Sequence, residues 1–228
     1  MSLILVINPN SNQAVTDTMS DTVAPLRIDG GPVIECVTMA SGPFGIQSQA
    51  DVEAVTLPLR ELVVRRQDAD AFIIGCFSDP GLAVCREATT KPVLGIQECA
   101  VMSALMQGDR FGVVALAPAS IKRQSRAFRQ MGVADRWAGS EPLHLSVEAA
   151  EEASAYPKVH AAAERLLARG ADTILLGCAG MVRHRAPLAE AFGVPVIDPT
   201  QAATAQAMGL VLLNAAAAVQ TTPRLATA

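Results

Sequence analysis

The fold is decided by Thr173-Ile-Leu-Leu-Gly-Cys178-Ala-Gly-Met181, because a matching phrase, Ala71-Phe-Ile-Ile-Gly-Cys76-Phe-Ser-Asp-Pro80, precedes it in the chain. Each phrase is a short apolar run that ends in glycine and cysteine. A run that is apolar at every position is typical of a strand buried on both faces of a parallel sheet. The offset of 102 residues between the two cysteines therefore indicates a duplicated α/β unit.

The starts of the two halves also match. Leu5-Val-Ile-Asn-Pro9-Asn-Ser11 aligns with Val114-Ala-Leu-Ala-Pro118-Ala-Ser120, and a second short strand follows each cysteine phrase. We predict an α/β fold with two pseudo-symmetric, Rossmann-like domains built on parallel sheets. Because ligands bind beyond the carboxyl ends of such strands, the active site is expected in the cleft between the domains. The predicted domains are residues 1–96 plus 200–228, and residues 97–199.

Short runs rich in Val, Ile and Leu alternate with longer segments that contain Ala and Arg. The predicted strands are residues 3–7, 33–37, 71–74, 93–95, 112–116, 143–147, 173–176 and 195–197. The predicted helices include residues 48–64, 119–131, 150–168 and 201–217. Since the chain continues beyond the second repeat, the last helix is expected to pack back onto the first half.

Composition limits the possible partners. The chain has 228 residues, of which 50% are hydrophobic, and its net charge is −4. This balance gives no electrostatic reason to expect nucleic acid or an anionic membrane, so we predict a small-molecule substrate. No apolar run has the length that a bilayer requires, and the amino terminus lacks the features of a secretory signal.

Cysteine usage indicates the compartment. Five cysteines, an odd number without the spacing of a disulfide framework, favour reduced thiols in the cytoplasm. No Cys-x-x-Cys pair or His-Cys cluster suggests a metal site, and we predict no metal.

Two cysteines in matched positions suit the removal and return of a proton at one carbon. In this interpretation each lies at the first turn of a helix, where the helix dipole and free N–H groups favour the thiolate and lower the thiol pKa modestly. Abstraction by one thiolate and reprotonation by the other thiol inverts a stereocentre. The same free amides would hold the enolate oxygen, and the expected donors are Phe77, Ser78, Ala179 and Gly180.

A single cysteine after a strand is more often a small core residue than a catalyst. Its occurrence at equivalent positions of two repeats favours catalysis for Cys76 and Cys178. We interpret Cys36, Cys85 and Cys99 as core residues. The three histidines show no arrangement of a catalytic triad, and His184 is expected to be exposed, so a hydrolase is possible but unsupported.

Further candidates lie near the strand ends. Asn8 is expected to point into the cleft, whereas Ser11 either caps a helix or binds the substrate. The Gly- and Pro-rich segment 41–48 is either a plain loop or a lid that contributes Ile46 and Gln47. Ala119 and Ser120, at the start of the second half, are expected to contact the substrate. Asp79 and Glu98 are interpreted as solvated or helix-capping residues.

Three motifs in order are Ile7-Asn-Pro-Asn-Ser11, Gly75-Cys-Phe-Ser-Asp-Pro-Gly-Leu82 and Leu176-Gly-Cys-Ala-Gly-Met181. Together they resemble the hydantoin and allantoin racemase branch of the aspartate/glutamate racemase superfamily. The resemblance implies racemisation by two bases without a cofactor, with Cys76 and Cys178 as the catalytic pair, in a homo-oligomer.

Departures from related patterns refine this expectation. Amino-acid racemases of the superfamily typically carry Asp-Ser-Gly near the first strand and Gly-Cys-Thr-His at the second cysteine. Asn8-Pro-Asn-Ser11 and Gly177-Cys-Ala-Gly180 replace these motifs here, which disfavours free glutamate or aspartate. Residues 42–47 and 115–120 also depart from the hydantoin racemase pattern and leave the exact substrate open.

We therefore predict a cofactor-independent racemase of a 5-substituted hydantoin or allantoin. The alternatives are another two-cysteine reaction, either maleate-type cis–trans isomerisation or racemisation of Asp or Glu, and a non-catalytic protein that binds a small anion.

Overall fold

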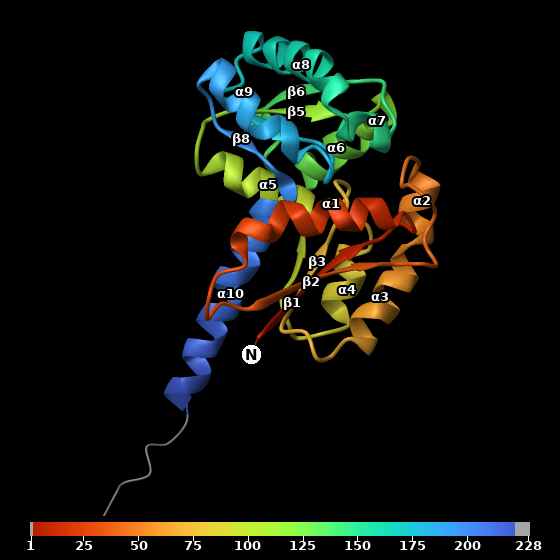
Figure 1. Ribbon diagram of the computed structural model, residues 1–228, viewed down its shortest axis with the longest axis vertical. Coiled ribbons are helices and arrows are strands. Elements are labelled where there is room, and N and C mark those ends of the chain that lie inside the picture. Colours follow the sequence, from red (N-terminus) through yellow and green to blue (C-terminus); the bar gives the residue numbers. More distant parts are fainter. Residues whose placement is uncertain (1, 222–228) are drawn as a thin grey trace, which may run out of the picture.

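The computed structural model describes residues 2–221, which form two α/β halves stacked one above the other (Figure 1). Each half contains a four-stranded parallel sheet, and the strand orders are β2-β1-β3-β4 and β6-β5-β7-β8. The two orders are the same once the second half is renumbered. The predicted α/β fold with two parallel sheets is confirmed.

The first half contains the elements from β1 to β4. Its strands are fully apolar where they are central: Ile4 and Val6 face one core cluster, whereas Leu5 and Ile7 face another. The elements are β1 (Leu3–Asn8), α1 (Gln13–Val23), η1 (Ala24–Leu26), β2 (Val33–Thr38), α2 (Gln49–Ala54), α3 (Thr56–Arg65), β3 (Ala71–Ile74), α4 (Leu82–Glu87) and β4 (Val93–Gly95).

The second half repeats this arrangement, and two further helices join the halves. The elements of the second half are β5 (Phe111–Ala115), α6 (Pro118–Gln130), η2 (Ala134–Arg136), β6 (Trp137–Pro142), α7 (Val147–Glu151), η3 (Ala153–Ala155), α8 (Tyr156–Ala168), β7 (Thr173–Leu176), η4 (Val182–His184), α9 (Arg185–Phe192) and β8 (Val196–Ile197). The joining helices are α5 (Ile96–Leu105) and α10 (Pro199–Thr221).

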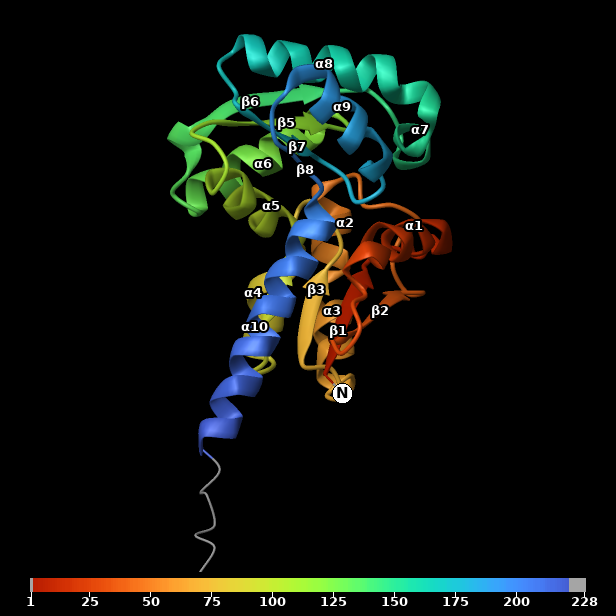
Figure 2. The same cartoon turned by 60° about the vertical axis from the view of Figure 1, so that its left-hand side comes forward.

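The last helix returns to the first half, as predicted. Figure 2 shows α10 leaving the upper half and running down beside the first sheet, and it contacts α1, α5, β1 and β3. Helix α5 contacts β4 of the first half and β5, β7 and β8 of the second half, so both halves touch it. The division into residues 1–96 plus 200–228 and residues 97–199 stays a prediction. None of the helices within residues 2–221 has the length and apolarity that a membrane span needs.

The predicted strand at residues 143–147 is wrong. The edge strand is β6, whose sequence Trp137-Ala-Gly-Ser-Glu-Pro142 contains too few apolar residues to be recognised as a strand. Glu141 of this strand pairs with Arg165 of α8 and with Arg169, which directly follows α8, and these two cations compensate its buried charge. The chain leaves the sheet after Pro142, which has no N–H to donate.

Two predicted helices are interrupted. The segment 48–64 forms α2 and α3, which meet at Val55, and the segment 150–168 contains the end of α7, then η3, then α8. Pro157 lies in the first turn of α8, where its missing N–H costs nothing.

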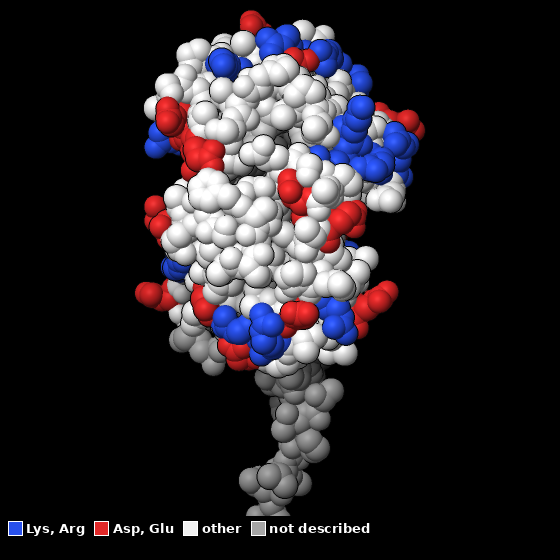
Figure 3. All heavy atoms as spheres, turned by 90° about the vertical axis from the view of Figure 1, so that its right-hand side faces the viewer, with Lys and Arg blue, Asp and Glu red and all other residues white. Residues whose placement is uncertain are grey.

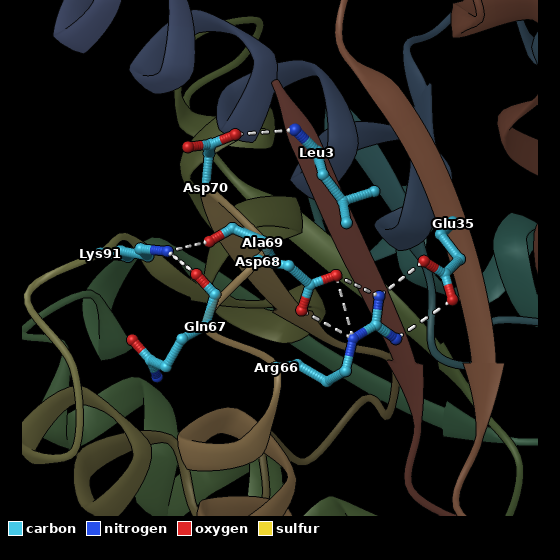
Figure 4. A network of polar contacts seen from close by, with 8 residues as sticks. All are labelled: Leu3, Glu35, Arg66, Gln67, Asp68, Ala69, Asp70 and Lys91. Atoms are coloured by element: carbon cyan, nitrogen blue, oxygen red, sulfur yellow. Dashed lines mark hydrogen bonds and ion pairs between the residues drawn. The ribbon is translucent and has the colours of Figure 1, made fainter. Parts of the chain in front are cut away.

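Polar contacts fasten the sheets at the amino-terminal ends of their strands. Figure 4 shows Arg66 bound to Glu35 and Asp68, and the Asp70 carboxylate accepting from the Leu3 N–H at 2.8 Å. In the second half Asp172, at the position equivalent to Asp70, accepts from the N–H of Arg110 at 3.0 Å. These contacts stabilise the amino-terminal ends of the strands in both sheets. The carboxyl ends of the strands lie at the opposite edge of each sheet, where a site is expected.

Candidate active site

The two cysteine phrases meet at one cavity of about 330 Å³. It is lined from both halves of the molecule. The first half contributes Asn10, Val15, Ile46, Gln47, Gly75, Cys76, Phe77 and Ser78. The second half contributes Leu116, Ala117, Ser120, Arg123, His144, Leu145, Ser146, Val147, Gly177, Cys178 and Ala179.

Glycine precedes each cysteine because the neighbouring strand passes close to it. Gly75 donates its N–H to the Ile7 carbonyl at 2.8 Å, and Gly177 donates to the Val114 carbonyl at 2.9 Å. A Cβ atom would lie only 2.9 Å from the Ile7 oxygen at Gly75 and 2.5 Å from the Val114 oxygen at Gly177. The glycines therefore let the chain leave each sheet and place a thiol at the cavity.

Cys76 is held at the cavity by a tight turn. Its carbonyl accepts from the N–H groups of Ser78 at 2.8 Å and Asp79 at 3.0 Å, and its Sγ lies 3.2 Å from the Ser78 Oγ. Burial raises the pKa of the Cys76 thiol to about 11, although hydrogen bonds from Ser78 oppose this shift.

Asp79 connects this turn to α5. It has a left-handed backbone with φ of 45°, and its carboxylate caps α5 by accepting from the N–H groups of Gln97 at 2.8 Å and Glu98 at 2.9 Å. Burial raises the pKa of the Asp79 carboxyl to about 7. Asp79 and Glu98 are both helix-capping residues, and both are half-buried.

Cys178 lies at the equivalent place in the second half. Burial raises the pKa of its thiol to about 12, while the N–H groups of Gly180 and Ala179 donate to the sulfur and oppose the shift. The negative charges of Glu151 and of a Cys76 thiolate raise the pKa further. Ionisation of one thiol therefore discourages ionisation of the other, which disfavours a state with two thiolates.

Comparison with known proteins decides the relationship. The family model for Asp/Glu/Hydantoin racemase matches residues 4–207. This chain belongs to the Asp/Glu/Hydantoin racemase family. It is 37% identical over 217 residues to the hydantoin racemase of Paenarthrobacter aurescens, with 92% of each chain covered.

Solved structures agree. The allantoin racemase from Klebsiella pneumoniae superposes with a TM-score of 0.88 at 32% identity, covering 94% of this chain and 89% of that one. The allantoin racemase from Pseudomonas fluorescens has a TM-score of 0.85 at 24% identity and covers 99% of each chain, which supports the fold. The resemblance to the hydantoin and allantoin racemase branch is confirmed, and the relationship indicates an isomerase of the racemase class.

The prediction that a helix dipole lowers the pKa of each cysteine thiol in this racemase is wrong. Helix α4 begins at Leu82 and η4 begins at Val182, so neither cysteine lies in the first turn of a helix. Turns separate each thiol from the helix that follows it. Burial outweighs the nearby amide donors, and both thiol pKa values are raised rather than lowered.

Asn8 does not line the cavity, contrary to expectation. It is fully buried, and its side-chain amide donates to the Asn10 Oδ1 at 2.9 Å, the Asn12 carbonyl at 3.0 Å and the Thr16 Oγ1 at 3.0 Å. Asn8 therefore shapes the turn that presents Asn10 to the cavity. Asn12, and not Ser11, caps α1.

The remaining substrate-contact predictions divide into two groups. The residues that line the cavity are Ile46, Phe77, Ser78, Ser120 and Ala179. Ala119 is an exposed residue of α6 and does not line it. Gly180 lies behind the cavity against Glu151, and only its amide faces Cys178. The Ser120 hydroxyl donates to the Ala117 carbonyl at 2.7 Å, so it also shapes the start of α6.

The segment 41–48 contributes to the cavity through Ile46 and Gln47, which favours its interpretation as a lid. It is tied to the first turn because the Ser11 N–H donates to the Pro43 carbonyl at 2.9 Å. A Cβ at Gly42 would lie 2.3 Å from the Pro9 carbonyl oxygen, so only glycine permits this approach.

Several lining residues are not predicted from the sequence. Residues 144–147 fall in a predicted strand but lie at the cavity, and His144 has a left-handed backbone with φ of 56°. Arg123 is absent from the predicted site, although it follows Ser120 by three residues and shares its helix face. That helical spacing is the signal available in the sequence.

Residues outside the cavity have structural roles. Cys85 and Cys99 are buried and Cys36 is half-buried, and all five cysteines are free thiols. His184 is buried rather than exposed, with its Nε2 at 2.9 Å from the Ala150 carbonyl. Within residues 2–221 no group of three His, Cys, Asp or Glu side chains is arranged as a metal site.

Proposed function

We propose that this racemase interconverts the enantiomers of a 5-substituted hydantoin or of allantoin, with Cys76 and Cys178 as its two bases and no cofactor. The observation that carries the proposal is the presence of two thiols, one from each duplicated half, at a single cavity. The relatives with hydantoin and allantoin racemase names support the substrate class.

In the proposed reaction one cysteine starts as a thiolate and the other as a thiol. The thiolate removes the proton from C5, the carbon between a ring nitrogen and a carbonyl, and the electron pair moves onto the carbonyl oxygen. The thiol then gives its proton to the opposite face of C5, and the electron pair returns. One thiolate and one thiol remain with their roles exchanged, so the reverse reaction uses the same residues.

The N–H groups beside the cysteines support the charged intermediates. Those of Ala179 and Gly180 lower the pKa of the Cys178 thiol, and the Ser78 hydroxyl lies 3.2 Å from the Cys76 Sγ. In the proposed mechanism they hold the thiolates, and the amides of the same turns stabilise the oxygen of the enolate as its charge develops.

The raised thiol pKa values are compatible with this chemistry. A thiolate whose parent thiol has a pKa of about 11 is a stronger base than an ordinary cysteine thiolate, and C5 of a hydantoin is a weak acid. The same raised pKa leaves only a small fraction of the thiol ionised at neutral pH, which lowers the rate there. We expect the rate to rise with pH for this reason.

We further propose a cytoplasmic homo-oligomer whose partner is a small molecule rather than nucleic acid or a membrane. Five unpaired cysteines and the net charge of −4 support the compartment and the partner class. Leu212 and Leu213 of α10 are 58% and 68% exposed and offer an apolar surface for a second copy.

Loss of optical activity tests the function. Enantiopure allantoin and enantiopure 5-isobutylhydantoin are incubated with the protein and followed by circular dichroism. A Cys76→Ser/Cys178→Ser variant measures spontaneous racemisation. Racemisation of either compound above the variant's rate is expected. Equal rates for both proteins and both compounds would contradict the proposal.

A further inference from the structure

Arg123 brings a full positive charge to the cavity, and no carboxylate faces it there. Among the lining residues from the described part of the chain there is no Asp, Glu or Lys. The rest of the lining is apolar or neutral, apart from His144 and the two thiols. A cation in such a setting attracts an anion, because water is partly excluded and nothing else offsets the charge.

The Arg123 side chain lacks the partners that a structural arginine has. Within residues 2–221 it forms no ion pair, and its Nε is buried without a hydrogen-bond acceptor. Arg66 and Arg165, by contrast, bind carboxylates directly, and Arg185 donates to the Val196 carbonyl. Burial lowers the pKa of Arg123, which is the sign of a cation that has lost water without gaining a partner.

The carboxylate that acts on Arg123 is already bound by other donors. Asp51 acts on Arg123 electrostatically, but its Oδ2 accepts from the Gln47 N–H at 3.0 Å and from the Ser48 N–H and hydroxyl, both at 2.8 Å. Asp51 therefore caps α2 and leaves the guanidinium of Arg123 free for another acceptor.

Activation of Cys76 does not account for Arg123. Its charge lowers the pKa of the Cys76 thiol, but this is the smallest of the effects on that thiol, whose pKa remains raised to about 11. A guanidinium placed to stabilise the thiolate would oppose burial more strongly. The guanidinium of Arg123, which has no carboxylate partner at the cavity, therefore remains available to a group of the substrate.

Helix α6 holds Arg123 in place. Pro118 starts this helix, and Gln124, beside Arg123, accepts from the Ser140 hydroxyl at 2.7 Å. The α6 sequence contains four cations, Lys122, Arg123, Arg126 and Arg129, and no acidic residue. In Figure 3 a group of basic side chains lies at one side of the upper half of the molecule, and further basic side chains lie at its top and on the lower half. The positive electrostatic potential produced by the α6 cations favours the binding of an anion near this helix.

We propose that the cavity accepts hydantoins whose C5 substituent ends in a carboxylate, and that Arg123 binds this carboxylate. A guanidinium presents paired N–H donors that match the two oxygens of a carboxylate. This inference rests on the proposed racemase function and narrows its substrate class. It concerns a side-chain carboxylate, since a hydantoin ring has no free α-carboxylate.

The test compares two substrates of nearly equal shape. These are 5-(2-carboxyethyl)hydantoin, which is anionic, and its neutral amide, 5-(2-carbamoylethyl)hydantoin. The wild-type protein is expected to show a higher kcat/KM for the acid. In Arg123→Gln the ratio of the two values should fall about 10- to 100-fold, as expected for lost charge-assisted hydrogen bonds. Arg123→Lys, which keeps the charge without the paired donors, should give an intermediate ratio.

Arg126→Gln is the matched control. Arg126 lies one turn further along α6, is exposed, and donates to Gln49 outside the cavity. Its substitution should keep the acid-to-amide ratio within about twofold of the wild-type value, because the effect of an exposed charge is screened by water and salt. A wild-type protein that does not discriminate, or an Arg123→Gln variant that loses both substrates equally, would overturn the inference.

Binding separates this inference from the proposed function. The Cys76→Ser/Cys178→Ser variant, with and without Arg123→Gln, is titrated with both hydantoins by calorimetry. Tighter binding of the acid that requires Arg123 supports the inference even if no hydantoin is racemised, in which case only the proposed reaction fails. Equal affinity for acid and amide overturns the inference whatever the catalytic result.

Discussion

Gly177→Ala tests the argument that glycine must precede each cysteine. The new Cβ would lie 2.5 Å from the Val114 carbonyl oxygen, 3.2 Å from Val113 Cγ1 and 3.3 Å from the Ala115 Cα. Two of these three neighbours are backbone atoms of β5 in the centre of a sheet, so they cannot rotate away as a side chain would. The end of β7 must instead move by roughly 1 Å, with Cys178 attached to it.

Two effects of different size follow. Overpacking against backbone should lower the free energy of unfolding by about 2–3 kcal/mol, and the midpoint temperature by roughly 5–10 °C for a chain of this length. The displacement of Cys178 should lower kcat/KM by about 100-fold, since catalysis is sensitive to shifts of this size.

Gly209→Ala is the control, because Gly209 is exposed within α10 and nothing lies within 4 Å of the position that a Cβ would take there. Alanine at this position should stabilise the protein by about 0.5–1 kcal/mol and leave the rate unchanged. Urea unfolding and the racemisation rate are measured for both variants. A Gly177→Ala protein with wild-type stability and rate would refute the steric argument.

Three further predictions concern the turn, the thiols and a buried carboxyl. Asn8→Ala should lower the free energy of unfolding by about 2–4 kcal/mol in urea, because a buried network of hydrogen bonds around Asn10 and Thr16 is lost; an unchanged midpoint would contradict this. The value of kcat/KM should rise with pH from 7 to 9, approaching tenfold per unit, since burial raises the pKa of Cys76 to about 11; a flat profile would refute the thiolate base. Burial raises the pKa of Asp198 to about 7, so the folded protein holds a proton that the unfolded chain, with a pKa of about 3.9, has released. The contribution of Asp198 to the free energy of unfolding should therefore be largest at low pH and be lost as the pH rises toward 7. The midpoint temperature of thermal unfolding, measured between pH 5 and 8, should fall less in Asp198→Asn than in the wild type. Equal falls in the two proteins would contradict this.

The parts of the fold that the sequence predicts are those with strong apolar patterns. Strands β3 and β7 match their predicted limits because each is a short run of mainly apolar residues followed by glycine, which is typical of a buried central strand. The duplication is detectable because a backbone carbonyl of the neighbouring strand leaves no room for a side chain at Gly75 or at Gly177. Both halves therefore have glycine directly before the cysteine.

The parts that escape prediction depend on distant contacts. Strand β6 is polar and is stabilised by ion pairs with α8, which lies well beyond it in the sequence. Asn8 and Asn10 are both polar residues at the end of β1, and only the three-dimensional turn shows which one faces the cavity. The thiol pKa values follow from burial between the two halves, a quantity that local sequence does not contain.

The central claim is that two cysteines act from opposite faces of one carbon. Its most direct test is exchange of the C5 proton in D2O, followed by NMR and chiral analysis, for each enantiomer of 5-isobutylhydantoin with Cys76→Ser and with Cys178→Ser. We predict that neither variant racemises the substrate, and that any exchange that survives is limited to one enantiomer in Cys76→Ser and to the other in Cys178→Ser. Racemisation by either variant at the wild-type rate would contradict the claim.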